Sequence, residues 1–451
     1  MDMNDTIVAL ATPEGRSALA LIRVSGPNAI NTVNKIFRNK DLSKVASHTI
    51  HYGWLYDADE PIDEVMVFVM HGPKTYTGED MVEITCHGSP LIIRRIIRVL
   101  QKYGARPAMP GEFTFKAFMN RKIDLLQAEA INDLINATNE EGYKIALKHL
   151  RGDISKTLSQ LREKLINLTS LIELELDFSE EDVEFASRDE LLKLIREVKQ
   201  IIKNLLDTYE TGMALKEGIK IAIVGNPNAG KSTILNALVK EERAIVSDIP
   251  GTTRDYIEET FSLEGYLFRI VDTAGIRQTT DPIEKIGVER TMEQVQKAHF
   301  TLYVYDVTQM SPNQVCEHIK TLPVSGDLLI IANKKDLIKN HNVELPNCYP
   351  ALLISAKDPK DIEKLTQELI KWAKENYSSE GIVLTSERQY NYLKLAYEAI
   401  KEAQEGIMNN IPQDLVASSL RSVIDYLGEL TGEITTEDIL GNIFANFCIG
   451  K

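Results

Sequence analysis

The residues with the clearest chemistry form the segment Gly225-Asn-Pro-Asn-Ala-Gly-Lys-Ser232. The segment follows an apolar run, residues 219–224, and precedes a helical pattern that begins at Thr233. Its glycines allow successive backbone N–H groups to point at phosphate oxygens, while Lys231 can reach the β- and γ-phosphates and Ser232 can offer a hydroxyl to Mg²⁺. We therefore predict a loop that binds a nucleoside triphosphate, with a strand before it and a helix after it.

Three further motifs each end an apolar run, as the phosphate loop does. Asp272-Thr-Ala-Gly275 would place a carboxylate near Mg²⁺ and a backbone N–H near the γ-phosphate. In Asn333-Lys-Lys-Asp336, the last carboxylate can accept hydrogen bonds from N1 and N2 of guanine, an arrangement that adenine cannot satisfy. Ser355-Ala-Lys357 would complete the guanine pocket. Four motifs in this order predict a GTPase.

The predicted GTP contacts lie within these motifs and within the segment that precedes the second of them. They are Gly225, Asn228, Ala229, Gly230, Lys231, Ser232 and Thr233; Ser247, Asp248, Ile249, Pro250, Gly251, Thr252 and Thr253; Asp272, Thr273, Ala274 and Gly275; and Asn333, Lys334, Asp336, Ser355, Ala356 and Lys357. Ser232 and Thr253 are the expected Mg²⁺ ligands, and Thr253 would hold its loop closed only while the γ-phosphate is present.

The position after Gly275 is Ile276, whose side chain cannot hydrogen-bond the attacking water. Catalysis must therefore use other groups, because phosphoryl transfer depends on positioning the water and on neutralising the charge that develops. Asn228 and the backbone carbonyls of residues 247–252 offer oxygen ligands that suit a hard monovalent cation. The alternative for Asn228 is a simple turn residue after Pro227.

Composition limits the class of protein. The chain has 451 residues, 43% of them hydrophobic, which is enough for two or three domains. It has no apolar run of about 18 residues and no basic start at the N-terminus, so we expect a cytoplasmic protein without a membrane segment. A net charge of −15 argues against a protein that coats nucleic acid with its whole surface. Its four cysteines lack metal-ligand spacing, so we expect reduced thiols and neither a zinc site nor a disulfide framework.

The motifs lie within one part of the chain, which divides into three kinds of sequence. Residues 217–376 read as a P-loop G domain inserted between helical patterns at 121–216 and 377–451. Residues 1–120 read as a compact α+β domain, with strands between Gly and Pro turns at 6–11, 18–24, 64–69 and 80–85. We expect the two helical parts to pack as one discontinuous bundle, giving a multidomain α/β protein. The alternative is two separate helical domains.

Several stretches together resemble one family. They are the opening Asp5-Thr-Ile-Val-Ala-Leu-Ala-Thr-Pro13, Tyr76-Thr-Gly-Glu-Asp80, Pro110-Gly-Glu-Phe-Thr114, Gly251-Thr-Thr-Arg-Asp255 and the terminal Phe447-Cys-Ile-Gly-Lys451. Over its whole length the chain resembles the tRNA-modification GTPase family MnmE, also called TrmE, of the TrmE-Era-Der group. This resemblance implies an N-terminal domain that binds tetrahydrofolate and dimerises, a discontinuous helical domain and an inserted Ras-like G domain.

The resemblance also implies an activity and partners. Members act with the flavin-dependent subunit MnmG, which carries the FAD, to install an aminomethyl or carboxymethylaminomethyl group at C5 of the tRNA wobble uridine, U34. GTP hydrolysis would be stimulated by K⁺ and coupled to association of two G domains. The expected assembly is a homodimer that joins MnmG in a heterotetramer or a larger complex.

Residue roles follow by matching motifs. The resemblance assigns 5-formyl- or methylene-tetrahydrofolate to Arg23, Glu83, Lys122 and Lys451, whose types suit a pterin edge and an anionic glutamate tail. It assigns K⁺ to Asn228, Ser247, Ile249 and Thr252, and it makes Glu284 the residue that orients the attacking water. Asn228 and Thr253 join Glu284 as the expected catalytic residues. The tail at Cys448–Lys451 should reach the folate pocket from a helix that ends near Phe444.

The sequence leaves two alternatives to a tRNA-modification GTPase. A ribosome-assembly GTPase of the Era or Der kind shares the G motifs, but no Gly-x-x-Gly clamp in a basic context follows this G domain. A folate-binding scaffold that hydrolyses GTP negligibly is the other alternative, and turnover in K⁺ against Na⁺ would distinguish it.

Overall fold

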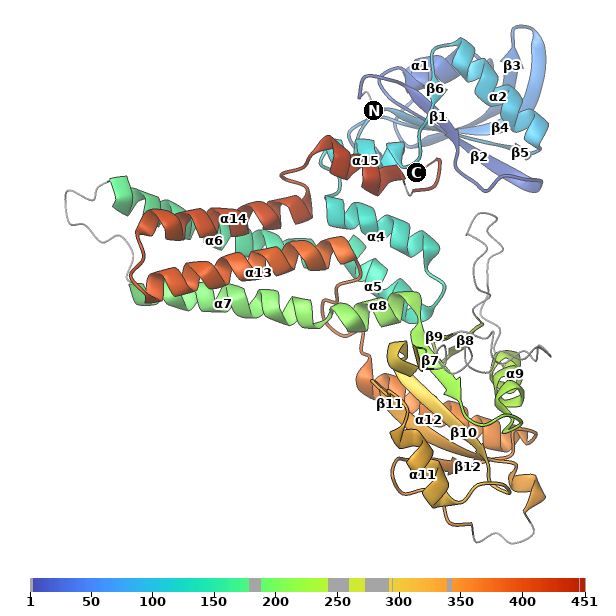
Figure 1. The fold of residues 1–451 in the computed structure, drawn as a ribbon. Coiled ribbons are helices and arrows are strands. Elements are labelled where there is room, and N and C mark those ends of the chain that lie inside the picture. Colours follow the sequence, from blue (N-terminus) through green and yellow to red (C-terminus); the bar gives the residue numbers. More distant parts are fainter. Residues whose placement is uncertain are drawn as a thin grey trace. The chain divides into compact units, whose positions relative to one another are not determined.

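The protein is represented by a computed structural model that describes residues 3–177, 188–241, 259–271, 292–293, 295–338, 343–445 and 447–450. The chain forms two compact units. One comprises Met1–Asn132, His149–Ser187 and Gly406–Lys451, and the other comprises Asp133–Lys148 and Arg188–Glu405. Each unit contains one six-stranded sheet (Figure 1). The helices in the described ranges include none that is long and apolar enough to cross a membrane.

The sheet of the first unit has the strand order β3-β4-β5-β2-β1-β6. Its strands are β1 (Ile7–Leu10), β2 (Ser17–Ser25), β3 (Thr49–Asp57), β4 (Glu60–Met70), β5 (Met81–Gly88) and β6 (Arg106–Pro107). All pairs are antiparallel except β1 with β6. The helices α1 (Ala29–Asn34) and α2 (Pro90–Lys102) share a core with the sheet that includes Val33, Ile84 and Ile96. A short 3₁₀ turn, η1, covers Leu42–Lys44.

Among the described residues, five further helices belong to the first unit. They are α3 (Glu112–Met119), α4 (Leu125–Asn136), α6 (Asp153–Asp177), α14 (Gln413–Thr431) and α15 (Glu437–Ala445). Helices α6 and α14 lie side by side and are joined by Arg421, whose Nε donates to Glu173 Oε1 at 2.7 Å. Helix α15 packs on α3 through Phe444, whose ring is 5.5 Å from that of Phe115.

The sheet of the second unit has the order β12-β11-β10-β7-β9-β8 and is parallel except between β8 and β9. Its strands are β7 (Ile219–Val224), β8 (Thr260–Leu263), β9 (Tyr266–Ile270), β10 (Phe300–Asp306), β11 (Asp327–Asn333) and β12 (Ala351–Leu353). Helices α9 (Lys231–Glu241) and α12 (Pro359–Asn376) contribute to one core, and α11 (Pro312–Lys320) contributes to another. A sheet with such cores is the doubly wound α/β arrangement, in which ligands bind beyond the carboxyl ends of the strands.

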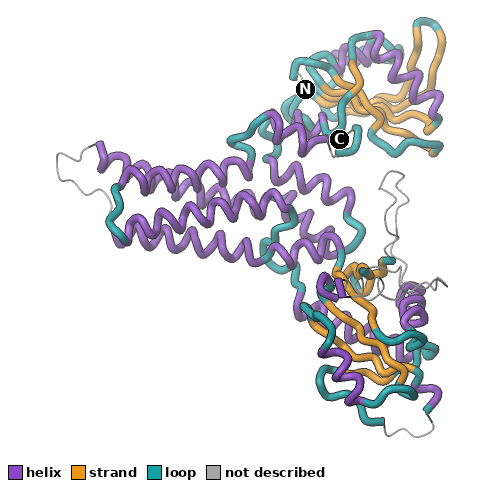
Figure 2. The backbone as a smooth tube through the Cα atoms, in the orientation of Figure 1, coloured by secondary structure: helices purple, strands orange, loops and turns teal. Residues whose placement is uncertain are grey.

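The second unit also holds the helices that precede and follow this sheet in the chain. They are α5 (Glu140–Leu150), α7 (Arg188–Asp207), α8 (Tyr209–Glu217) and α13 (Glu387–Met408). Figure 2 shows them in purple. Lys199 of α7 donates to Gln404 Oε1 of α13 at 2.8 Å. Helices from the two sides of the inserted sheet therefore pair, α6 with α14 and α7 with α13.

The fold class predicted from sequence is confirmed as multidomain α/β. Strands were expected at 6–11, 18–24, 64–69, 80–85 and 219–224, and β1, β2, β4, β5 and β7 lie there. Strand β3 was not predicted, because Ile50, Tyr52 and Trp54 alternate with polar or small residues but turn outward to the surface. The boundaries at residues 120, 216 and 376 stay a prediction.

One expectation about the cysteines is wrong. A disulfide joins Cys316 of α11 to Cys348, with Cα atoms 6.0 Å apart. The two residues are separated by 32 positions, so no short spacing in the sequence marks them as a pair. Cys86, which is buried, and Cys448, which is exposed, are free thiols as expected.

Candidate functional site

The phosphate loop joins β7 to α9 and needs its glycines. Gly225 has φ +137°, and a Cβ there would lie 1.8 Å from the carbonyl oxygen of Val304. Gly230 has φ +98°, and a Cβ there would lie 2.2 Å from Nδ2 of Asn333. Asn228 lies between them in the left-handed region, at φ 62°, and is exposed. The loop therefore has the close approaches and left-handed backbone that a phosphate cradle requires.

Lys231 begins α9 and turns its ammonium group back over this loop. Its Nζ donates to the carbonyl oxygens of Gly225 at 2.7 Å and Asn226 at 2.9 Å. Burial lowers the pKa of Lys231 from its ordinary value. Both of these acceptors are neutral carbonyl oxygens, so a phosphate group bound in the loop would supply the negative partner of the Lys231 ammonium group. The loop and Lys231 therefore fit a nucleotide phosphate. Ser232, the predicted Mg²⁺ ligand, and Thr233 follow on the exposed first turn of α9.

The segment predicted to read the base lies against the phosphate loop. Asn333, 2% exposed, donates from Nδ2 to the Ala229 carbonyl at 2.8 Å and accepts at Oδ1 from the Ala356 N–H at 3.0 Å. Asp336 is exposed and accepts a hydrogen bond from Ser355 Oγ at 2.8 Å. The motifs at 225–232, 333–336 and 355–357 thus meet at one edge of the sheet. Lys357 contributes its backbone N–H to Ser355 Oγ at 3.4 Å.

Two buried acids that the sequence did not single out support the base-reading segment. Asp306 ends β10 and accepts from Lys334 Nζ at 2.7 Å; burial opposes its ionisation, but hydrogen bonds from Lys334 and Thr308 outweigh burial and lower its pKa. Asp361 of α12 accepts from the Ser355 N–H at 3.0 Å. Burial opposes its ionisation too, and the bond from Ser355 with those from two lysines lowers its pKa. No spacing signal in the sequence connects Asp361 to the motifs it supports.

Several predicted site residues lie outside the described ranges. They are Ser247, Asp248, Ile249, Pro250, Gly251, Thr252, Thr253, Asp272, Thr273, Ala274, Gly275, Glu284 and Lys451. Their assigned contacts to GTP, Mg²⁺, K⁺, water and folate stay predictions.

In the first unit, Arg23 and Glu83 come together on neighbouring strands. Arg23 on β2 is directly opposite Glu83 on β5, and its Nε donates to Glu83 Oε1 at 2.8 Å. The guanidinium carbon lies 5.2 Å from the ring centroid of Tyr76 and 5.7 Å from that of Phe113. Both rings come from motifs that resemble the family, although neither was predicted as a site residue. Charge and aromatic surface thus lie side by side, as a ligand with a flat ring and an anionic tail requires.

The C-terminal tail reaches this arginine. Arg23 Nη1 donates to the Gly450 carbonyl at 3.1 Å, and the Gly111 N–H donates to the Cys448 carbonyl at 3.4 Å. Helix α15 ends at Ala445, close to the predicted end at Phe444. Phe447 is buried and packs against Phe444, with ring centroids 5.3 Å apart. The tail is therefore anchored by an apolar contact before it meets Arg23.

Lys122 follows α3 and is less closely tied to the other predicted folate residues. Its Nζ donates to the Pro73 carbonyl at 3.0 Å, and its stem lies beside Gly78. It also lines a hollow of about 770 Å³ together with Arg121, Gln127 and Glu433. Arg23 and Glu83 do not line this hollow.

Comparisons with known proteins cover nearly the whole chain. Residues 125–448 match the family profile "MnmE helical domain", and residues 6–122 match "GTP-binding protein TrmE N-terminus". Among solved structures, the G domain of FeoB from Methanococcus jannaschii aligns with 25% identity and a TM-score of 0.25, covering 35% of this chain and 98% of that one.

Curated relatives match this chain over nearly the full length of both sequences. The protein called "tRNA modification GTPase MnmE" in Christiangramia forsetii is 46% identical over 474 residues and covers 100% of both chains. The protein of the same name in Cytophaga hutchinsonii is 44% identical, covering 99% of this chain and 98% of the relative, and that in Salinibacter ruber is 44% identical, covering 100% of both. The chain therefore belongs to the MnmE family of tRNA modification GTPases.

Proposed function

We propose that the chain hydrolyses GTP to control the addition of an aminomethyl or carboxymethylaminomethyl group at C5 of U34 in tRNA. The observation that carries the GTP part is the Asn333 side chain, which joins the base-reading segment to the phosphate loop through Ala229. The tRNA part is supported by membership of the family, whose curated members carry tRNA modification in their names.

Hydrolysis requires groups that hold the phosphates and the attacking water. Lys231 and the N–H groups of the loop would neutralise charge on the phosphates, and Ser232 with Thr253 would hold Mg²⁺, which supplies charge neutralisation at the phosphate oxygens. Asn228, together with Ser247, Ile249 and Thr252, would hold K⁺, and Glu284 would orient the attacking water. Support for Asn228 is its exposed position inside the phosphate loop.

The same proposal places a tetrahydrofolate at Arg23. A carboxylate such as Glu83 matches the donor edge of a pterin, and cations such as Arg23, Lys122 and Lys451 match the glutamate tail of the ligand. The rings of Tyr76 and Phe113 would flank Arg23 in that complex. The ligand would be a 5-formyl- or methylene-tetrahydrofolate.

A homodimer is supported by one face of the first sheet. Ile50, Tyr52 and Trp54 on the edge strand β3 are 58%, 66% and 40% exposed, and Met66 lies directly opposite Tyr52 on β4. An exposed edge strand with an apolar face is usually covered by a partner. A second copy of this chain would cover it, and the dimer would join the FAD-carrying MnmG subunit in a heterotetramer or larger complex in the cytoplasm.

The test of the GTPase proposal compares hydrolysis in K⁺ and in Na⁺. We expect faster hydrolysis in K⁺, and association of the G domains only with a transition-state mimic and K⁺ together. Asn228→Gly is the most specific variant for this test, because glycine keeps the left-handed backbone and removes only the side-chain oxygen proposed to bind K⁺. It should abolish the preference for K⁺ while GTP still binds. Equal rates for the unsubstituted chain in both salts would overturn the K⁺ proposal, and negligible rates in both would favour a non-hydrolysing scaffold.

The tRNA proposal needs its own measurement. A strain that lacks its MnmE-family gene should regain modified wobble uridines, measured by mass spectrometry, when it expresses this chain. The same strain expressing Lys231→Ala should not, because the phosphate loop would lose its cation. Unmodified uridines with the unsubstituted chain, in the presence of its own flavin-dependent partner, would count against the proposal.

A further inference from the structure

The segment 71–80, between β4 and β5, carries Tyr76 onto Arg23. It has neither helix nor strand, so its conformation depends on side-chain bonds. The Tyr76 hydroxyl shares a hydrogen bond of 2.8 Å with Thr114 Oγ1 on α3, and the Tyr76 ring lies over the Arg23 guanidinium. Phe113, also on α3, flanks that guanidinium as well. The position of Arg23 thus depends on how the segment is held against α3.

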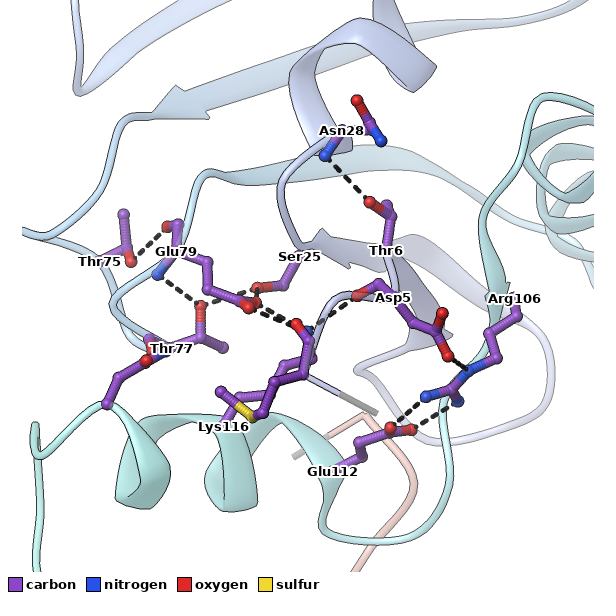
Figure 3. Close-up of polar contacts among 12 residues, drawn as sticks. Asp5, Thr6, Ser25, Asn28, Thr75, Thr77, Glu79, Arg106, Glu112 and Lys116 are labelled. Carbon is purple, nitrogen blue, oxygen red and sulfur yellow. Dashed lines mark hydrogen bonds and ion pairs between the residues drawn. The ribbon is translucent and has the colours of Figure 1, made fainter. Parts of the chain in front are cut away.

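Glu79 is the residue that holds this segment together. Its carbonyl oxygen accepts from Thr75 Oγ1 at 2.7 Å, and its N–H donates to Thr77 Oγ1 at 3.2 Å (Figure 3). Thr77 is fully buried, and its own carbonyl accepts from Asn120 Nδ2 at 2.8 Å. These bonds close the turn around Tyr76 from both sides.

The carboxylate of Glu79 joins the segment to α3 and β2, and through Lys116 to the N-terminal segment. Lys116 of α3 donates to both of its oxygens, at 2.9 and 3.0 Å, and Ser25 at the end of β2 donates to one at 3.0 Å. Lys116 Nζ also donates to the carbonyl of Asp5 at 2.8 Å and that of Met3 at 3.1 Å. Figure 3 shows Lys116 between Glu79 and the N-terminal segment. The Lys116 side chain is 1% exposed and that of Glu79 is 14% exposed.

A buried ion pair of this kind is weak evidence for stability, because removing two charges from water costs about as much as their attraction returns. The ion pair between Glu79 and Lys116 does determine which parts of the domain contact each other. Lys116 lies on the same short helix as Phe113 and Thr114, so the pair sets the position of Tyr76 relative to both of these residues. An arginine held between two rings loses little further freedom when a ligand binds.

We propose that Glu79 and Lys116 are positioning residues for the Arg23 site: their ion pair holds Tyr76 against Arg23 and thereby sets the affinity for tetrahydrofolate. This inference rests on the folate part of the proposed function. Neither residue touches the ligand; each acts through Tyr76. The segment Tyr76–Asp80 then has a physical role, because it supplies both the ring and the acid that positions the ring.

The experiment is a double-mutant cycle on the full chain with 5-formyl-tetrahydrofolate as the probe, measured by calorimetry. Glu79→Gln keeps the size of the side chain and removes its charge, so we expect affinity to fall about tenfold, equivalent to about 1.4 kcal/mol. In a Tyr76→Ala background the same substitution should change affinity little. Glu60→Gln, which breaks the exposed ion pair with Arg95, is the matched control and should leave affinity unchanged.

Additive losses in the two backgrounds would overturn the positioning role, since Glu79 would then act without Tyr76. If Glu79→Gln does not fold, Ser25→Ala removes one bond to Glu79 and leaves the ion pair intact. It should give a smaller loss that also disappears without Tyr76.

A second measurement separates this inference from the folate proposal. Burial raises the pKa of the Tyr76 phenol, and loosening the segment should return that pKa toward its ordinary value. NMR titration of ¹³C-labelled tyrosine measures the Tyr76 pKa without any ligand, and the Tyr76→Phe variant identifies which signal belongs to Tyr76. If the unsubstituted chain binds no folate, the folate proposal fails. An unchanged Tyr76 pKa in Glu79→Gln overturns the positioning role by itself.

Discussion

The Asn333 side chain connects the base-reading segment to the phosphate loop, because its Nδ2 donates to the Ala229 carbonyl at 2.8 Å. The same amide accepts from the Ala356 N–H at 3.0 Å. One buried side chain thus sets the spacing between the loop proposed to bind the phosphates and the segment proposed to bind the base. A small change in that spacing would therefore disturb the contacts to the phosphates and the contacts to the base together.

Asn333→Ala should therefore weaken nucleotide binding without removing any group that touches the nucleotide's phosphates. Leaving the Ala356 N–H without its partner in a buried position costs about 1–3 kcal/mol of stability. We expect affinity for GDP and GTP to fall together, by roughly tenfold to a hundredfold. Fluorescent GDP titration measures this. Asn376→Ala, which loses only an exposed bond to the Trp372 carbonyl, is the control; equal losses in the two variants would contradict the bridging role.

Asp336→Asn should change which base the site accepts. The carboxylate is exposed and already oriented by Ser355, so it can receive N1–H and N2–H of guanine. An amide presents a donor in place of one acceptor, which disfavours guanine and favours xanthine. We expect GTP affinity to fall and xanthosine triphosphate affinity to rise, measured by competition. Glu363→Gln, an exposed acid on α12, should alter neither. Unchanged GTP affinity in Asp336→Asn would show that the base is read elsewhere.

The motifs at 225–232, 333–336 and 355–357 could be found from the sequence because each is local, and the structure brings them together at one edge of the sheet. Their contacts to GTP stay predictions. A phosphate loop or Asn-Lys-Lys-Asp carries its chemistry within eight residues, and the strand before it is a continuous apolar run. Asp361, which binds the Ser355 N–H, is supplied by a distant element and carries no local signal. Phe113 lies in a motif that resembles the family, but nothing in that motif indicates that its ring flanks Arg23. Tertiary packing alone brings them to the site.

The same reasoning explains the incorrect expectation for Cys316 and Cys348. Their pairing depends on how α11 lies beside the residues that precede β12, which composition cannot show. Strand β3 was not predicted for a related reason. Its large residues face outward, so its pattern does not show the buried face that marks a core strand.

The double variant Cys316→Ser, Cys348→Ser should be less stable than the unsubstituted protein. The cross-link closes a loop of 32 residues, and chain entropy gives about 3–4 kcal/mol for a loop of that size. Urea unfolding measures the loss, and a dithiol reductant added to the unsubstituted chain should reproduce it. Cys448→Ser, at an exposed free thiol, is the control. A non-reducing peptide map with all four thiols free would contradict the cross-link.

Asp361 should make stability fall in acid. Its pKa is lowered in the folded protein, so the folded state takes up its proton at lower pH than the unfolded state does. The stabilisation is present above the unfolded pKa of about 3.9 and is lost as pH falls through the lower folded pKa. The difference in unfolding free energy between the unsubstituted protein and Asp361→Asn should therefore be constant above about pH 5 and shrink below about pH 4. Urea titrations at several pH values test this, and a pH-independent difference would refute it.

Deleting Cys448–Lys451 should separate GTP hydrolysis from the proposed folate binding and tRNA modification. The deletion removes the Gly450 carbonyl that accepts from Arg23, but it keeps Phe447, which packs on Phe444 and anchors the end of α15. GTP hydrolysis should survive, whereas folate binding and wobble-uridine modification should be lost. Cys448→Ser keeps the backbone and changes only an exposed thiol, so folate binding by that variant would assign the effect of the deletion to the backbone and the terminal residue. Intact modification by the truncated chain would refute any role for the tail, because Arg23 would then hold the ligand without it.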